Sequence, residues 1–330
     1  MYVGVDVHER ESQIAIFEPG GKLLYETRIE TKELSRFIGS LRGEKHVAIE
    51  SIGFIYPIYD ELKALPMCHV HVANPNRVQL IAKSKTKSDV IDAKVLGDLL
   101  RTNYLPTSWI PEDEETREKR LIVKDRVRYG VRKSGIKGSI KWLLKRKGIE
   151  VKSPFSIAGR KQLKSLGLFE IESRLEELSL VESMIKKLDG MIVKLVSGDK
   201  NAKLLDTLPG IAPYTALFLS SHVGDVNRFP DSRHMCADLG LVPMLHQTGD
   251  TKVLGHITKT GNKWLRRNLV ECARAAIKKD QNLRKFYLKL RRKRGEKKAL
   301  IAVARKLISY AYWMLKRNLT YEELDPWSRS

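Results

Sequence analysis

A short apolar strand that carries one carboxylate constrains this chain more than any other stretch. Residues 2–7 are apolar and β-branched apart from Asp6, and a second apolar run follows at 12–17. Gly20-Gly21 then leads into a third run at 22–29, a pattern typical of an antiparallel meander. An ionised carboxylate inside a buried strand needs a cation or hydrogen-bond donors. Asp6 is therefore either a site residue or a strand-end residue that caps a loop.

The elements expected after the meander complete one domain. The pattern predicts a helix at 31–41, a strand at 46–50, a helix at 56–65, a strand at 68–73, and helices at 77–82 and 89–100. The order β-β-β-α-β-α-β-α is that of an RNase H-like fold, in which helices cover both faces of the sheet. We assign residues 1–105 to this α/β domain.

Four carboxylates fall at the ends of these elements. Asp6 lies in the first strand, Glu50 ends the fourth, and Asp89 and Asp92 share one face of the last helix. The helix dipole alone would also favour the last two. Oxygen ligands from several elements suit Mg²⁺ or Mn²⁺, and two such ions can stabilise the attacking and leaving oxygens of a phosphoryl transfer. The arrangement predicts a two-ion site, with the basic residues Lys85 and Lys87 of the preceding loop contacting nucleic acid.

The charge balance indicates a polyanionic partner. Lys and Arg number 61 against 39 Asp and Glu, which gives a net charge of +22. No apolar run approaches the length of a membrane span, and no signal peptide is recognised, so we expect a cytoplasmic protein without a membrane partner. The three cysteines are far apart and form no CxxC pair, which favours reduced, buried residues. His69 and His71 face one side of a strand, but without a third ligand they are assigned a structural role.

Residues 106–200 are expected to form two long helices. The first, about 112–147, is strongly basic, and the second, about 168–196, has apolar residues at intervals of three and four. Joined by a loop, they predict an antiparallel hairpin or coiled coil. A solvated stalk is the structural alternative, but the basic helix favours self-association and contact with nucleic-acid backbones. The residues that we expect to make these contacts are Arg126, Arg128, Arg132 and Lys133.

Residues 201–330 form the third expected domain, mainly helical. The stretch 204–216 has the pattern of a helix-hairpin-helix turn, in which Gly210 lets backbone N–H groups approach a phosphate; a helix-capping turn is the alternative. Helices are expected at about 232–239, from 263, and at 283–316 with a break at Gly295. The segment 244–250 is expected to be irregular.

That irregular segment contains a candidate nucleophile. Thr248 precedes a glycine, and Lys259, Arg266 and Arg267 follow nearby in sequence, a setting that suits a hydroxyl attacking a phosphate. The alternative is that Thr248 is only a loop residue.

Taken together, these blocks resemble the DEDD-type insertion-sequence transposases, which are bridge-RNA-guided DNA recombinases. The resemblance covers nearly the whole chain in the right order. The N-terminal blocks that carry it are Val3–His8, Ala48–Gly53, Ala73–Val78 and Lys87–Ala93. The C-terminal blocks are Leu208–Ile211, Arg228-Phe229, Gly240–Pro243, Gln247–Gly249, Ile257–Asn262 and Leu265-Arg266.

The resemblance implies an RuvC-like domain with Asp6, Glu50, Asp89 and Asp92 as the metal-binding tetrad, a coiled-coil dimerisation region and a C-terminal transposase domain. It further implies a dimer or tetramer that binds DNA and a structured guide RNA, in a prokaryotic cytoplasm and at the nucleoid when active. The family's nucleophile is a serine in a Gln-Ser-Gly segment, a position that holds Thr248 here. Lys87-Ser88-Asp89 likewise replaces the usual Lys-Thr-Asp.

Threonine keeps the hydroxyl but adds a β-methyl group that crowds an in-line attack. Three alternatives follow: Thr248 is the nucleophile, this copy is impaired, or a nearby residue serves instead. A Holliday-junction-type nuclease that uses metal-activated water is the rival enzyme hypothesis. A catalytically inactive nucleic-acid-binding protein is the third.

Overall fold

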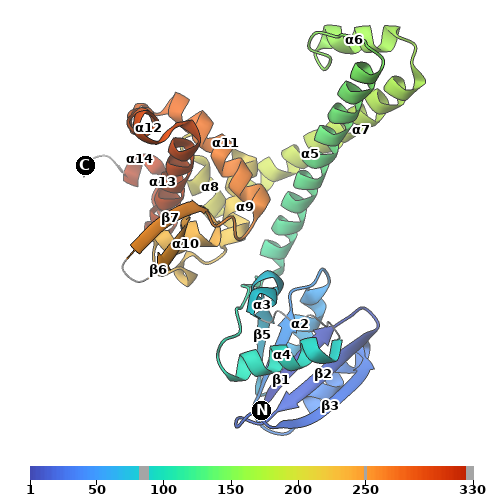
Figure 1. Cartoon of the computed structure of the whole chain (residues 1–330), viewed down its shortest axis with the longest axis vertical. Coiled ribbons are helices and arrows are strands. Elements are labelled where there is room, and N and C mark those ends of the chain that lie inside the picture. The colour runs from blue at the N-terminus through green and yellow to red at the C-terminus, as the bar shows by residue number, and fades with distance from the viewer. Residues whose placement is uncertain (82–88, 249–250, 325–330) are drawn as a thin grey trace. The chain divides into compact units, whose positions relative to one another are not determined.

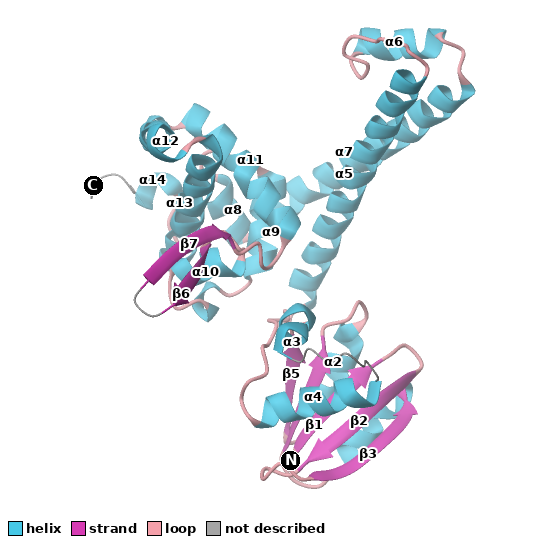
Figure 2. Cartoon of the chain, viewed as in Figure 1, coloured by secondary structure: helices cyan, strands magenta, loops and turns pink. Residues whose placement is uncertain are grey.

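The computed structural model describes residues 1–81, 89–248 and 251–324. The chain forms two compact units, Met1–Ile110 and Pro111–Ser330. Unit 1 is a mixed α/β domain and unit 2 is mostly helical (Figure 2). Lys85, Lys87 and the expected capping residue Ser88 lie outside the described residues.

Unit 1 is built on a five-stranded sheet of order β3-β2-β1-β4-β5. β1, β2 and β3 are antiparallel, whereas β4 and β5 run parallel to β1, so the expected meander and the later parallel strands are confirmed. The strands are β1 (Tyr2–Val7), β2 (Glu11–Phe17), β3 (Leu23–Glu30), β4 (Lys45–Glu50) and β5 (Cys68–Ala73). The helices are η1 (Thr31–Glu33), α1 (Leu34–Ser40), α2 (Ile55–Lys63), α3 (Pro75–Ile81) and α4 (Asp89–Arg101).

Alternation along the strands gives the two faces of the sheet different roles. Val3, Val5 and Val47 belong to one fully buried cluster, which also includes side chains of α1 and α2. The residues that alternate with these, Gly4 and Asp6 among them, point to the opposite face, which α4 crosses (Figure 1). The sheet therefore has a helix-covered apolar face and a second face that carries Asp6.

Unit 2 begins with the expected helical hairpin. α5 (Glu114–Arg146) and α7 (Phe169–Gly198) pack along one another, with the short α6 (Ile157–Ser165) between them in the chain (Figure 1). At one end of the hairpin, Ile140, Leu163 and Leu178 are fully buried in a separate apolar cluster. Asp113 caps α5 by accepting a hydrogen bond from the Thr116 amide at 2.7 Å.

The hairpin is not a separate unit, unlike the three-part division expected from sequence. Val123 of α5 and Ile192 of α7 are 1% exposed and belong to the same core as the C-terminal helices. Apolar periodicity along a helix shows that one face is buried, but it does not show which neighbour buries it. Here the C-terminal helices cover one end of the hairpin.

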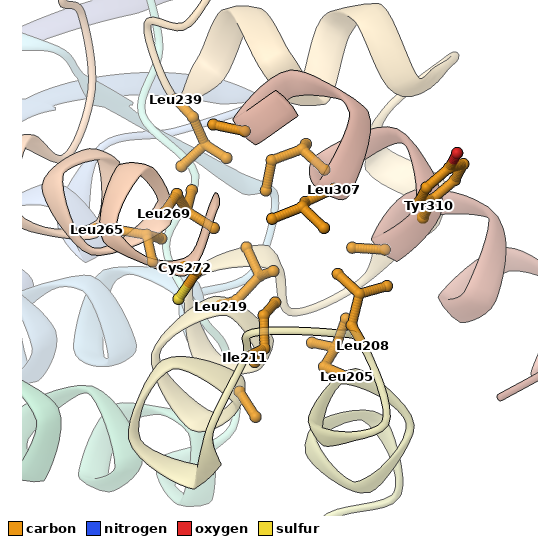
Figure 3. Packing of buried hydrophobic residues seen from close by; sticks show 14 of the residues in the cluster. Leu205, Leu208, Ile211, Leu219, Leu239, Leu265, Leu269, Cys272, Leu307 and Tyr310 are labelled. Atoms are coloured by element: carbon orange, nitrogen blue, oxygen red, sulfur yellow. The ribbon is translucent and has the colours of Figure 1, made fainter. Parts of the chain in front are cut away.

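The C-terminal core is a mainly helical cluster into which Leu205, Leu219, Leu269 and Leu307 point from four helices (Figure 3). Cys236 and Cys272 are buried, as expected, whereas Cys68 is only half-buried. The break at Gly295 is confirmed. The helices are α8 (Lys200–Asp206), α9 (Pro213–Val223), η2 (Val226–Arg228), α10 (Ser232–Asp238), α11 (Lys263–Lys279), α12 (Gln281–Arg294), α13 (Glu296–Arg317) and α14 (Tyr321–Leu324).

The expectation of an irregular segment at 244–250 was wrong. β6 (Pro243–Thr248) and β7 (Thr251–Ile257) form an antiparallel ribbon in which Thr248 pairs with Thr251. The intervening Gly249-Asp250 is itself a two-residue hairpin signal. The flanking residues lack a clear apolar alternation, so their periodicity did not indicate strands.

Candidate metal centre and nucleic-acid interface

The candidate centre depends on how closely α4 approaches β1. A Cβ atom on Gly4 would lie 2.0 Å from the Ala93 carbonyl oxygen and 2.4 Å from the Gly97 nitrogen. The missing side chain therefore allows the helix backbone to rest directly on the strand backbone. This contact places the first turn of α4, with Asp89 and Asp92, near the carboxyl end of β1, where Asp6 lies.

Three ligand-type side chains converge there. Atoms of Asp6, His8 and Asp89 lie within 4.8 Å of one another. His8 Nε2 is 3.2 Å from Asp6 Oδ2 and 3.5 Å from Asp89 Oδ1. Asp89 also faces Arg28, whose Nη2 atom lies 3.6 Å from Asp89 Oδ2. Asp6 is 7% exposed, whereas the side chains of His8 and Asp89 are about half exposed.

The electrostatics of this cluster favour a bound cation. Burial raises the pKa of the Asp6 carboxyl, and the charges of Asp89 and Asp92 raise it further, while His8 acts in the opposite direction. The ionised carboxylates therefore repel one another in a partly desolvated site. A divalent cation would relieve this repulsion, and oxygen donors are those that Mg²⁺ and Mn²⁺ prefer.

Glu50 and Asp92 belong to the same end of the sheet. Val5 pairs with Ile49 in parallel register. Asp6 and Glu50 are the next residues on the two strands, so they lie side by side at neighbouring strand ends. Glu50 is half-buried, and Asp92 is an exposed residue in the first turn of α4. The fold thus brings the four predicted carboxylates to one edge, and the charge of Asp92 acts on the Asp6 pKa.

His8 is the member of the cluster that sequence reasoning missed. It lies just beyond β1, in the motif Val3–His8, and its partner Asp89 is 81 positions away. No spacing rule connects two such residues. A histidine two positions after a strand carboxylate was the available signal, because alternation puts both on the same side.

The basic residues predicted on α5 mostly pair with α7. Arg126 Nε is 2.6 Å from Asp189 Oδ1, Arg132 Nε is 2.9 Å from Glu177 Oε1, and Lys133 Nζ is 3.0 Å from Glu182 Oε1. Arg128 instead pairs with Asp125 on its own helix, and its side chain is 64% exposed. These residues lie along one helix as expected, but three of the four help to hold the hairpin together.

The predicted basic residues of the C-terminal region meet in one place. Lys259, Arg266 and Arg267 line a shallow cavity of about 270 Å³. Arg266 Nη1 also donates to the carbonyl oxygen of Thr260 at 2.6 Å, and burial lowers the pKa of its guanidinium. Lys259 and Arg267 therefore present the more available charges for an anion.

Gly210 has a packing role in the turn between α8 and α9. Its φ is +82°, and a Cβ atom would lie 2.4 Å from the Cys272 carbonyl oxygen of α11. The glycine thus allows the turn to contact the backbone of α11. Its predicted contact with a phosphate stays a prediction, and so does the role of Thr248, which ends β6 in unit 2.

No helix within the described ranges is both long and apolar enough to span a bilayer.

Comparisons with known proteins match both units. Residues 3–146 match a family model described as a DEDD transposase of the IS110 type. Residues 202–288 match the model of the IS116/IS110/IS902 transposase family. These matches show an insertion-sequence transposase, a class of enzymes that cleave and rejoin DNA.

Individual relatives agree with these matches. A transposase for insertion sequence element IS1111A of Coxiella burnetii is 24% identical over 97% of this chain and 90% of its own length. A transposase for IS1328 of Yersinia enterocolitica is 25% identical over 84% of each chain. A probable family 20 transposase of Pseudomonas aeruginosa is 31% identical over 44% of each. The chain belongs to the IS110/IS116 family of transposases.

Proposed function

We propose that this transposase is a Mg²⁺-dependent recombinase of an insertion element, which cuts DNA through a covalent link to a protein hydroxyl and then rejoins it. The observation that carries the proposal is the convergence of Asp6, His8 and Asp89 beside Glu50 and Asp92. The strand order β3-β2-β1-β4-β5 supports an RNase H-like assignment for unit 1.

The four carboxylates would hold one or two divalent ions, Mg²⁺ or Mn²⁺. Such ions neutralise phosphate charge and lower the pKa of an attacking hydroxyl. Buried Asp6 is a fixed ligand within the sheet, whereas Asp89 and Asp92 reach the site from the first turn of α4. His8 Nε2 lies within 3.5 Å of oxygens of both Asp6 and Asp89 and would hold the two carboxylates together before an ion binds.

Thr248 would be the nucleophile. Its Oγ1 atom would attack the phosphorus of a DNA phosphodiester, form a Thr–O–P bond, and break the bond from phosphorus to the bridging sugar oxygen. The threonine proton would leave to solvent or a base, and the released sugar hydroxyl would take up a proton. Attack by a DNA hydroxyl on the Thr–phosphate would then rejoin the strand, so the bond energy is conserved without a nucleotide cofactor.

Lys259 and Arg267 would bind phosphates at the Ile257 end of the β6–β7 ribbon, opposite the Thr248 end. The remaining basic surface of α5, α12 and α13 would bind DNA and a structured guide RNA. The α5–α7 hairpin would support a homodimer or homotetramer. In such an assembly, the carboxylates of one subunit would form an active site together with Thr248 of another subunit. Recombination would take place in the cytoplasm, on nucleoid DNA.

A denaturing gel tests the proposal. Protein, structured RNA, labelled element-end DNA and Mg²⁺ are incubated, and wild type is compared with Asp6→Ala, Thr248→Ala and Thr248→Ser. A protein–DNA adduct in wild type and Thr248→Ser that is absent from Asp6→Ala and Thr248→Ala is expected. Thr251→Ala is the matched control, because Thr251 pairs with Thr248 across the hairpin.

Other outcomes would favour the rivals. Free cleaved ends lost only in Asp6→Ala would indicate a nuclease that uses activated water. An adduct lost in Thr251→Ala but kept in Thr248→Ala would move the nucleophile to the neighbouring hydroxyl. Salt-sensitive binding without any cleavage would indicate an inactive nucleic-acid-binding protein.

A further inference from the structure

Three histidines lie together on the α4 face of unit 1, at the end of the sheet away from Asp6. His46 of β4 pairs in register with His69 of β5, and Ala48 pairs with His71. Side chains at 69 and 71 point to the same face because they are two residues apart. The third ligand that the His69-x-His71 pair lacks in sequence is supplied by the neighbouring strand.

The three rings are in contact. The His46 and His69 ring centroids are 4.9 Å apart, and the His46 and His71 centroids are 5.7 Å apart. His46 Nε2 and His69 Nε2 both approach one oxygen of Glu44, at 3.7 and 3.0 Å. Two imidazole nitrogens thus converge on a single carboxylate, so three ligand-type side chains are neighbours at one end of the sheet.

A purely structural role does not explain the environment of His71. Its Nε2 atom is buried and has no hydrogen-bond partner within the described part of the chain. A buried polar nitrogen without a partner destabilises the fold unless something binds it. A metal ion is one such partner for a neutral imidazole.

The charge state of the rings is compatible with metal binding. Burial lowers the pKa of His46 and of His71, and the neighbouring histidines lower both further, while Glu44 opposes the shift at His46. Both shifts favour the neutral imidazole. The neutral form is the one that coordinates metals.

We propose that His46, His69 and His71 bind a divalent transition metal such as Zn²⁺, with Glu44 as a fourth ligand. Imidazole suits Zn²⁺, Ni²⁺ and Cu²⁺ far better than Mg²⁺, so this site and the carboxylate centre select different ions. The rings are stacked here, so binding turns His46 and His69 until their nitrogens face one point. The His69 side chain is 54% exposed, which leaves room for this turn.

The site is separate from the catalytic centre. β1 and β4 are parallel, and His46 lies four residues before Glu50 on β4, a separation of about 13 Å along the strand. Metal binding at the histidine site would have a structural effect. The metal would join the edge strand β5 to β4, and binding to the folded state alone would stabilise unit 1 by mass action.

Calorimetric titration of Zn²⁺ into full-length protein without a histidine tag tests the proposal, with excess Mg²⁺ present to occupy the carboxylates. Wild type is compared with His69→Gln, His46→Gln and a control, His234→Gln, an exposed histidine of α10 that pairs with Asp231. One Zn²⁺ per chain is expected in wild type and in the control. Each site variant should bind about tenfold more weakly or worse.

Unfolding temperature provides a second readout. Zn²⁺ should raise it in wild type and leave His69→Gln unchanged, and His69→Gln should fold normally because its side chain is exposed. The proposal is overturned by wild type that binds no stoichiometric Zn²⁺, or by equal binding in the His46→Gln/His69→Gln double variant. Binding that is lost only on His8→Gln would assign the ion to the carboxylate centre and overturn it equally.

Discussion

Gly97 of α4 lies against Gly4 of β1 so closely that a Cβ on Gly97 would be 3.1 Å from the Gly4 nitrogen and 2.8 Å from the Phe17 ring. Two glycines, 93 positions apart, thus determine how near a helix comes to a central strand. Because Asp89 and Asp92 are carried by that helix and Asp6 by that strand, the glycine contact determines the size of the carboxylate site.

Gly4→Ala is expected to unfold or displace α4. The new methyl group would meet backbone atoms of Ala93 and Gly97, which cannot move aside as a side chain can. Overpacking of this kind typically costs about 1–3 kcal/mol. Thermal unfolding and Mn²⁺ titration should show a less stable protein with weaker metal binding.

Gly190→Ala on α7 is the matched control. That glycine is exposed, and nothing lies within 4 Å of the added Cβ. Alanine is a better helix former, so this variant should be more stable by about 0.5–1 kcal/mol. Equal destabilisation by both substitutions would show that the α4–β1 contact is not special.

Asp6→Asn should abolish strand cleavage and yet stabilise the metal-free protein. The raised pKa of Asp6, caused first by burial and then by Asp89 and Asp92, means that its ionised form opposes folding above the ordinary carboxyl pKa. Removing that charge should add roughly 0.5–2 kcal/mol of stability. Chemical denaturation in a chelator at pH 7 measures the change.

The same chemical denaturation, repeated near pH 3, tests whether the stabilisation comes from the Asp6 charge. Below the unfolded pKa both states are protonated, so the advantage of Asp6→Asn should vanish there. An advantage that persists at low pH would point to a packing effect instead of a charge effect.

His8→Ala should change the metal preference of the centre. Imidazole binds Mn²⁺ more readily than Mg²⁺, which requires oxygen ligands and keeps its water. If His8 contacts the ion, Mn²⁺ affinity should fall about tenfold or more while Mg²⁺ affinity changes little. Loss of the nitrogen signal in pulsed electron paramagnetic resonance of the Mn²⁺ complex would report this contact directly, and an unchanged signal would contradict it.

Lys119→Met should severely destabilise unit 2. Lys119 is 8% exposed, and its Nζ lies 2.6 Å from Asp199 Oδ2, while Asp199 also caps α8 and accepts from Ser220. Breaking a buried pair by removing one partner typically costs about 3–5 kcal/mol, because the other charge is left uncompensated. Denaturant unfolding measures this loss.

Adding Asp199→Asn to Lys119→Met should restore part of that stability. Asparagine keeps the oxygen that accepts the Ala202 amide but carries no charge. A double variant no more stable than Lys119→Met would mean that packing of the lysine stem, and not the ion pair, provides the stability.

Arg126→Ala and Arg128→Ala should behave differently. Arg126 pairs with Asp189 of α7 and lies over the Tyr214 ring at 5.0 Å, so its loss should lower the unfolding temperature. Arg128 is exposed, so its loss should leave stability unchanged but reduce by about one the slope of log affinity for DNA or RNA against log salt. The reverse pattern would show that the ion pair across the hairpin is unimportant.

Local order in the sequence was enough to predict most elements and where the four candidate carboxylates lie on them. Asp6 and Glu50 stand at the ends of recognisable strands, and Asp89 opens a recognisable helix, so hydrophobic periodicity and turn residues placed them correctly. The β6–β7 ribbon was missed because its sequence shows no clear apolar alternation. Periodicity also left open which elements would pack together, and so the hairpin was assigned to a domain of its own.

The sequence by itself determined which residues are apolar, which carry charge and where elements begin, because backbone preferences and turn chemistry act over a few neighbouring positions. Only the tertiary structure decided which distant side chains share a site. Parallel register placed His46 beside His69, the glycine contact brought Asp89 to His8, and antiparallel packing paired the arginines of α5 with carboxylates of α7. These relationships depend on how elements cross and align, and burial of the shared core sets that geometry.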